Sequence, residues 1–196
     1  IAYWPKLKRF LEFRGYPTSP QQMEDLLKDF YEKERLADMK LKRLKRFLLS
    51  DLAFKLWFSD PEEVSKSFTR IWHNLSSVMR QDKNAKTIAF AMKCLGIALL
   101  LAGESSFNFE QIPIPVDYRI KKFTERLGLK VESDDAIRTF WRMVLDSLRS
   151  RGIPINMLHL DSLIWQIGTM ERHEIIEYFE NLGIKIVGEK LAGLVE

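Results

Sequence analysis

The stretch "NAKTIAFAMKCLGIALLLAG", residues 84–103, decides the fold class of this chain. Its apolar residues recur at helical spacing up to Gly103, which marks the end, so it predicts a helix apolar enough to lie centrally in the protein. Apolar residues recur at the same spacing along most of the chain, while the alternation typical of strands is nearly absent. The sequence therefore predicts an all-α protein with two helical lobes and a cleft between them.

The composition is that of a folded protein. With 196 residues, 46% of them hydrophobic, the chain is long enough to bury a core, and its net charge of +4 permits nucleic-acid binding without requiring it. Cys94 is the only cysteine, which excludes an internal disulfide and favours a reducing cytoplasm. No stretch reaches the apolar length that spans a membrane, and residues 1–10 have neither a signal-peptide core nor an initiator methionine. We expect a cytoplasmic monomer with no membrane partner, whose chain starts partway into the gene product.

Capping residues mark the starts of several other helices. Each precedes an apolar stripe, and they stand at Ser19, Asp60, Ser133 and Asn156. The stripe after Asp60 runs without interruption to Met79. A last helix is predicted over 171–182, and the tail 184–196 is expected to pack loosely as strand or turn. The basic run at 33–51 could contact phosphates, but such runs usually form the solvated face of a long helix.

An irregular segment follows the central helix. Residues 110–119, "EQIPIPVDYR", place two prolines two positions apart just before Asp117. Because Pro115 suits a helix start, residues 116–119 are expected in the first turn, where unpaired amides can meet an anion. The helix, the irregular hairpin and the next helix together form a predicted helix-hairpin-helix element over about 84–128. Without further context, the preferred interpretation of Asp117 is that it complements the helix dipole.

Three residues of the central helix line one face. Lys86, Phe90 and Lys93 follow the spacing i, i+4, i+7. A lysine in so apolar a helix would lose solvation, and a second lysine nearby would further disfavour its charge, so the free amine becomes a more accessible nucleophile. The alternative is a solvated lysine face.

A later helix carries Asp161 and Trp165, four residues apart, which places a carboxylate beside an indole. A lone tryptophan on a helix is more often part of the core than a platform for a nucleic-acid base. The core interpretation is therefore preferred for Trp165 when it is considered alone.

Several kinds of chemistry are excluded. The histidines, at 73, 159 and 173, do not stand at zinc-ligand spacing with the single cysteine. No G-x-S-x-G turn and no glycine-rich phosphate loop occurs. We expect neither a metal nor another cofactor.

Three segments together resemble a known family. "NAKTIAFAMK" (84–93), "IPIPVDYR" (112–119) and "LHLDSLIW" (158–165) are similar to signature stretches of the archaeal 8-oxoguanine DNA glycosylases, which are N-glycosylase/DNA lyases of the helix-hairpin-helix glycosylase superfamily. The resemblance extends from about Trp4 to Trp165. It implies a single glycosylase domain over 1–196, acting in an archaeal cell on DNA that contains 8-oxoguanine. It also implies base excision repair through a lysine Schiff base followed by β-elimination.

The resemblance also implies roles for individual residues. By position, Lys86 matches the Schiff-base lysine and Asp117 the catalytic aspartate, while Phe90 and Trp165 match residues that enclose the extruded base. Further base-pocket positions are implied at Pro115, Asp161, Lys93 and Trp4. DNA phosphates are expected to be held by basic groups such as Arg119.

The chain departs from the family pattern in two places, and two other interpretations stay open. The hairpin lacks the L-P-G-V-G type core of the wider superfamily. No counterpart is present for the upstream helical stretch that supplies a glutamine, so we expect an incomplete base pocket. The alternatives are a non-catalytic helix-hairpin-helix DNA-binding protein and a helical interaction scaffold with Phe90 and Trp165 in its core. Without the resemblance, the scaffold is preferred.

Overall fold

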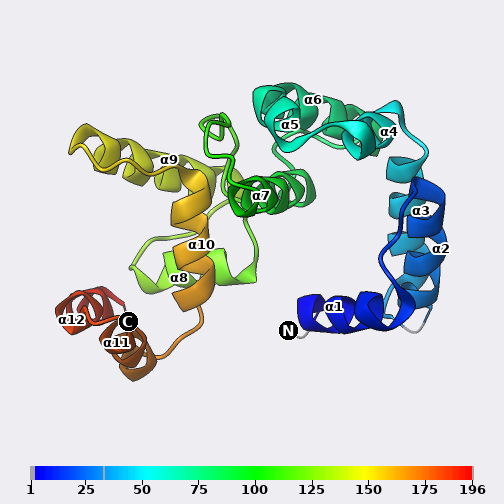
Figure 1. The fold of residues 1–196 in the computed structure, drawn as a ribbon. Helices are drawn as coiled ribbons and strands as arrows, with labels where there is room; N and C mark the ends of the chain where they lie inside the picture. Colours follow the sequence, from blue (N-terminus) through cyan, green and yellow to red (C-terminus); the bar gives the residue numbers. More distant parts are fainter. Residues whose placement is uncertain (1–2, 33, 196) are drawn as a thin grey trace. The chain divides into compact units, whose positions relative to one another are not determined.

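The computed structural model describes residues 3–32 and 34–195, and every regular element in these ranges is a helix (Figure 1). The predicted all-α class is therefore confirmed. The chain divides into two compact units, the first formed by Ile1–Lys83 with Ala102–Phe107 and the second by Asn84–Leu101 with Asn108–Glu196. The predicted cleft between two lobes stays a prediction. No helix within the described ranges is long and apolar enough to cross a membrane.

The first unit holds the helices from the amino end to the start of the central stretch. These are α1 (Tyr3–Arg14), α2 (Pro20–Tyr31), α3 (Ala37–Leu48), α4 (Asp51–Phe58), α5 (Pro61–Lys66) and α6 (Phe68–Met79). Ser19 and Asp60 cap their helices as predicted, accepting hydrogen bonds from the third following amide. The uninterrupted helix expected after Asp60 is wrong, because the backbone turns at Ser67 and divides it into α5 and α6. Of the basic run, Ala37–Leu48 form α3, and the helix goes no further because Ser50 caps a new helix, α4.

The core of the first unit lies along α6. Phe68 and Trp72 are almost fully buried, and the Trp72 indole N–H donates to the carbonyl of Lys83 at 2.8 Å. The returning segment 102–107 joins this core through Phe107, whose ring centroid lies 4.8 Å from that of Phe68. Segments far apart in the sequence therefore share one apolar interior.

The second unit contains the central helix and everything after the hairpin. Its helices are α7 (Lys86–Leu101), α8 (Tyr118–Arg126), α9 (Asp134–Ser150), α10 (Met157–Ile167), α11 (Arg172–Asn181) and α12 (Lys185–Leu194). Ser133 and Asn156 cap α9 and α10 as predicted. The last predicted helix is confirmed as α11.

The expectation of a loosely packed tail is wrong, because residues 185–194 form α12. A Cβ atom at Gly188 would lie 2.8 Å from Cβ of Phe179 and 3.1 Å from Cα of Ile176, so α12 packs closely against α11. Ala192 and Val195 are buried by this helical hairpin. Tertiary packing therefore decides the conformation of a segment whose two interior glycines weaken its helix propensity.

The hairpin between α7 and α8 is anchored from both sides. Its apolar residues Ile112, Ile114 and Val116 are buried.

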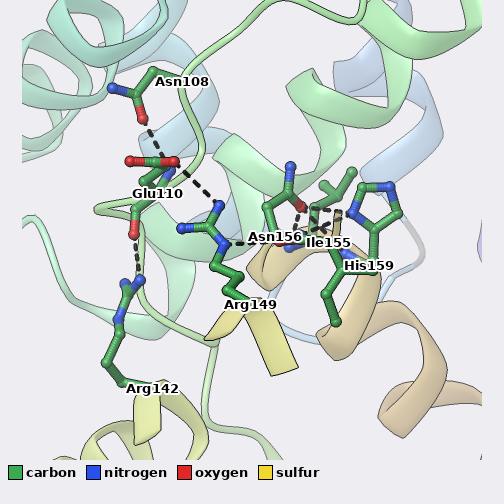
Figure 2. A network of polar contacts seen from close by, with 8 residues as sticks. Asn108, Glu110, Arg142, Arg149, Ile155, Asn156 and His159 are labelled. Atoms are coloured by element: carbon green, nitrogen blue, oxygen red, sulfur yellow. Dashed lines mark hydrogen bonds and ion pairs between the residues drawn. The ribbon is translucent and has the colours of Figure 1, made fainter. Parts of the chain in front are cut away.

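On the polar side of the hairpin, two arginines of α9 contact Glu110 (Figure 2). Arg142 donates to the Glu110 carbonyl, and Arg149 lies 3.1 Å from the carboxylate while it also donates to the carbonyl of Ile155 at 2.9 Å. This network of polar contacts ties the hairpin to α9 and to the segment that leads into the Asn156 cap of α10.

The packing of α8 against α9 depends on a buried hydroxyl, which gives the first prediction. Trp141 donates its indole N–H to Thr124 Oγ1 at 2.9 Å, and that hydroxyl donates to the Ile120 carbonyl at 2.6 Å. Thr124→Val keeps the shape but leaves the buried indole N–H without an acceptor, so it should lower the free energy of unfolding by about 1–3 kcal/mol in urea denaturation. Thr124→Ser keeps the hydroxyl and should lose about 1 kcal/mol at most, for one methyl group. Equal losses in both variants would show that the hydrogen bond contributes nothing.

Candidate active site

Asp117 is the N-cap of α8. Its Oδ1 accepts hydrogen bonds from the amides of Arg119, at 2.9 Å, and Ile120, at 3.0 Å. The prediction that these first-turn amides are free to meet an anion is wrong for both, and the helix begins at Tyr118 because Asp117 itself satisfies them. Among the described residues, no hydrogen bond or ion pair engages Oδ2 of this half-buried carboxylate. The cap therefore holds the carboxylate in place and leaves one oxygen for other partners.

A buried ion pair joins α7 to α10. Lys93 Nζ contacts Asp161 Oδ2, and the two residues are only 7% and 1% exposed. Apart from Lys93, no residue within the described part of the chain donates a hydrogen bond to either Asp161 oxygen. Burial raises the pKa of the Asp161 carboxyl; Lys93 opposes this effect, and the charge of Asp117 adds to it. Asp117 thus lies close enough to Asp161 for its negative charge to raise the pKa of the Asp161 carboxyl.

Trp165 lies one turn after Asp161 and is 39% exposed, so it is not the core tryptophan of the alternative interpretation. The guanidinium of Arg119 lies over its ring, 4.0 Å from the centroid, and Lys93 Nζ lies 5.9 Å from the same centroid. Arg119 Nη1 also donates to the Trp165 carbonyl at 2.8 Å. The two contacts between Arg119 and Trp165 join residues 46 positions apart and could not be predicted from the sequence, and the predicted phosphate contact of Arg119 stays a prediction.

The other predicted site residues lie at α7 and at the hairpin. Lys86 is exposed at the first residue of α7, so the loss of solvation expected for a lysine of this face falls on Lys93 instead. Phe90, one turn further, is 40% exposed, which argues against the core role that the scaffold hypothesis gives it. Pro115 is buried within the hairpin.

The structure does not bring all of these residues into contact. Within residues 3–32 and 34–195, Lys86 makes no hydrogen bond or ion pair with Asp117. Trp4 lies in α1, but its side chain falls outside the described part, so its predicted place in the pocket is untested. The residues that do meet in one place are Lys93, Asp161, Trp165 and Arg119, with Asp117 close by.

These features define an all-helical protein with an exposed lysine at the start of its central helix and a capping carboxylate after a proline-containing hairpin. The sequence matches the family described as AGOG: N-glycosylase/DNA lyase over residues 2–192, and the chain belongs to this family. The resemblance inferred from the three short segments is thereby confirmed.

Individual relatives support the assignment. An N-glycosylase/DNA lyase of Methanococcus maripaludis is 36% identical over 140 residues, which cover 68% of this chain and 49% of the relative. One of Methanopyrus kandleri is 34% identical over 160 residues, covering 79% and 59%. One of Nanoarchaeum equitans is 32% identical over 145 residues, covering 72% and 58%. The chain therefore spans about half to three fifths of the length of these curated relatives.

The cap geometry gives a prediction about Asp117. Asparagine caps helices as well as aspartate does, whereas alanine offers no acceptor. Asp117→Ala should therefore lower the free energy of unfolding by about 0.5–2 kcal/mol, and Asp117→Asn should leave it nearly unchanged. Thermal and urea denaturation of the two variants would check this. A large loss in Asp117→Asn would mean that the charge, and not the cap, stabilises α8.

The buried ion pair gives a prediction with a definite pH dependence. Lys93→Met removes the charge, keeps a long side chain and leaves Asp161 buried alone, so it should cost about 3–5 kcal/mol of unfolding free energy at neutral pH. Burial already raises the pKa of Asp161, and loss of Lys93 raises it further, so the folded state binds this proton more readily than the unfolded chain does. Acidification through that pKa therefore favours the folded variant, and the loss should shrink as the pH falls.

The measurement is urea denaturation of the wild type and Lys93→Met at mildly alkaline and mildly acidic pH. The double variant Lys93→Met/Asp161→Asn is the matched control, because it has no buried charge and should recover most of the loss at neutral pH. A loss of the same size at both pH values would contradict a buried charged Asp161.

Proposed function

We propose that this chain is a bifunctional DNA glycosylase and DNA lyase that excises 8-oxoguanine from DNA in base excision repair. Its membership of the N-glycosylase/DNA lyase family supports the reaction class. The observation that carries the choice of base is the Asp161 carboxylate, which is buried beside an exposed tryptophan and has unfilled acceptor positions.

The target base must leave the duplex to be reached. Extrusion costs a few kcal/mol, which stacking on aromatic side chains helps to offset. Phe90 and Trp165 each present a partly exposed ring in the second unit. Because the guanidinium of Arg119 covers one face of Trp165, the base stacks on the other face.

The damaged base differs from guanine at N7, which is an acceptor in guanine and carries a proton in 8-oxoguanine. A fixed acceptor therefore pairs with the damaged base and is left unpaired against guanine, which costs most where the acceptor is buried. Asp161 meets this condition by its burial. Burial raises the pKa of its carboxyl, and the adjacent Lys93 opposes that rise in favour of the ionised, acceptor-only form. A backbone carbonyl near Pro115, in the buried end of the hairpin, is the other acceptor that this function could use.

The reaction then uses a lysine amine and a carboxylate. Lys86, as the neutral amine, attacks C1′ of the sugar, and the bond to the base breaks with its electron pair leaving on the base. Asp117 stabilises the positive charge that develops on the sugar and accepts the amine proton; its Oδ2 serves this role, since Oδ1 is held by the helix cap. The C1′–O4′ bond of the resulting aminal then breaks as the nitrogen forms the C=N bond of the Schiff base, and O4′ takes up the proton that Asp117 had accepted. The Schiff base makes the C2′ proton acidic, and transfer of that proton to a base expels the 3′ phosphate by β-elimination.

The second candidate function is a helix-hairpin-helix protein that binds DNA without catalysis. The hairpin and the net positive charge favour it as much as they favour the enzyme. It differs in needing no amine nucleophile, so strand nicking at an 8-oxoguanine separates the two functions.

Borohydride trapping tests the proposal. The wild type should form a covalent complex with 8-oxoguanine DNA, because the hydride reduces the Schiff base to a stable amine. Lys86→Gln should abolish the trapped complex. Lys130→Gln, at an exposed lysine of the same unit, is the matched control and should trap like the wild type. A complex that survives Lys86→Gln would exclude this lysine as the nucleophile, and DNA binding with neither trapping nor nicking would favour the non-catalytic function.

A further inference from the structure

Two arginines on one face of α8 reach the end of α10. Arg119 Nη1 donates to the carbonyl of Trp165 at 2.8 Å, and Arg126 Nη1 donates to the carbonyl of Met170 at 2.6 Å. The two arginines are seven residues apart, so they project from the same face of α8. Trp165 lies in the last turn of α10, where carbonyls lack partners within the helix and a positive charge is favourable. The two arginines therefore hold the carboxyl end of α10, and the turn that follows it, against α8.

A glycine makes this approach possible. A Cβ atom at Gly168 would lie 2.9 Å from the Arg119 carbonyl oxygen and 2.6 Å from that of Ile164. Its φ of −63° is open to any residue, so the requirement at this position is space and not backbone conformation. The backbone at the end of α10 thus lies directly against the first turn of α8, at Arg119 itself.

Arg119 also touches the other half of the site. Its backbone amide donates one of the two hydrogen bonds that Asp117 Oδ1 accepts, at 2.9 Å, while its guanidinium lies 4.0 Å from the centre of the Trp165 ring. One residue therefore contacts the aspartate through its backbone and the tryptophan through its side chain. Both contacts lie within the second unit.

We infer that Arg119 is a positioning residue that holds the Trp165 ring in a fixed place relative to the Asp117 carboxylate, so that stacking of the extruded base aligns the sugar with the aspartate. This inference rests on the proposed function. Arginine suits the task because its planar guanidinium can stack on an indole and donate to a carbonyl at the same time, which the point charge of lysine cannot do. With the guanidinium removed, Trp165 regains rotamer freedom and the base is bound in a range of positions.

A role in positioning and a direct phosphate contact predict different results. A phosphate contact would be kept largely by Arg119→Lys, and its loss in Arg119→Ala would reduce the slope of log K against log salt by about one. A positioning role instead predicts that Arg119→Lys does not restore the excision rate. It also predicts that the salt dependence of DNA binding is the same in the variants as in the wild type. The defect should fall on the single-turnover excision rate, by about tenfold to a hundredfold, because small misplacements of a reacting group have effects of this size.

The experiment measures single-turnover excision of 8-oxoguanine, strand nicking at a preformed abasic site, and salt-dependent binding for the wild type, Arg119→Lys, Arg119→Ala and Arg126→Ala. Arg126→Ala removes the neighbouring hydrogen bond to the Met170 carbonyl and leaves both contacts of Arg119 to Trp165 in place, so it should lower the melting temperature and keep the excision rate. Nicking of the abasic site needs no stacked base and should be reduced much less than excision in the Arg119 variants.

Excision at the wild-type rate in Arg119→Lys, or a salt slope reduced by one in Arg119→Ala, would overturn the inference and support a phosphate contact. If Arg119→Ala does not fold, Arg119→Lys decides alone, because it retains the length and the charge. Failure of the proposed function is a separate result: the wild type itself would then excise no 8-oxoguanine.

Discussion

The second unit is organised around one costly interaction, the buried ion pair between Lys93 and Asp161. Removing two charges from water costs several kcal/mol for each ion, and their attraction offsets this cost only where the geometry is good. The contact joins α7 to α10 with both partners almost inaccessible, and no other side chain or amide among the described residues donates to the carboxylate. An apolar pair of similar volume would hold these two helices together at lower cost. Under the proposed function the pair serves recognition, since it holds a buried acceptor beside Trp165 for the extruded base.

The interpretations of Asp117 as a helix cap and as a catalytic carboxylate need not compete. Under the proposed function its two oxygens would have separate roles, because both capping hydrogen bonds use Oδ1 and leave Oδ2 for the sugar. A carboxylate that is fixed by its own backbone turn needs no further reorganisation when charge develops near it, which is the condition for effective electrostatic stabilisation. The hairpin adds rigidity before this turn, since Ile114 and Val116 are buried and Glu110 is held by arginines of α9.

Local features of the fold could be predicted from the sequence, and long-range ones could not. The caps at Ser19, Ser133 and Asn156 depend on residues within one turn, and each lies where it was expected. The helical tail could not be predicted, because α12 depends on close packing against α11 at Gly188, which no local pattern reveals. Likewise, helical spacing placed Lys86 and Lys93 on one face of α7 but could not show that only the second is buried. Gly168 and the stacking of Arg119 on Trp165 join distant segments and carry no signal in a single sequence.

The route of the chain has a consequence for how the protein can be dissected. Because α7 belongs with the later helices while the short segment 102–107 returns to the earlier ones, the backbone passes between the two units three times, after residues 83, 101 and 107. No single truncation point yields either unit intact. A fragment that starts at Asn84 would carry one residue of its partner's core, Phe107, without the Phe68 ring that packs against it. Isolating the second unit would require replacing residues 102–107 with a short flexible connection, so that the Phe107 ring is not left in water.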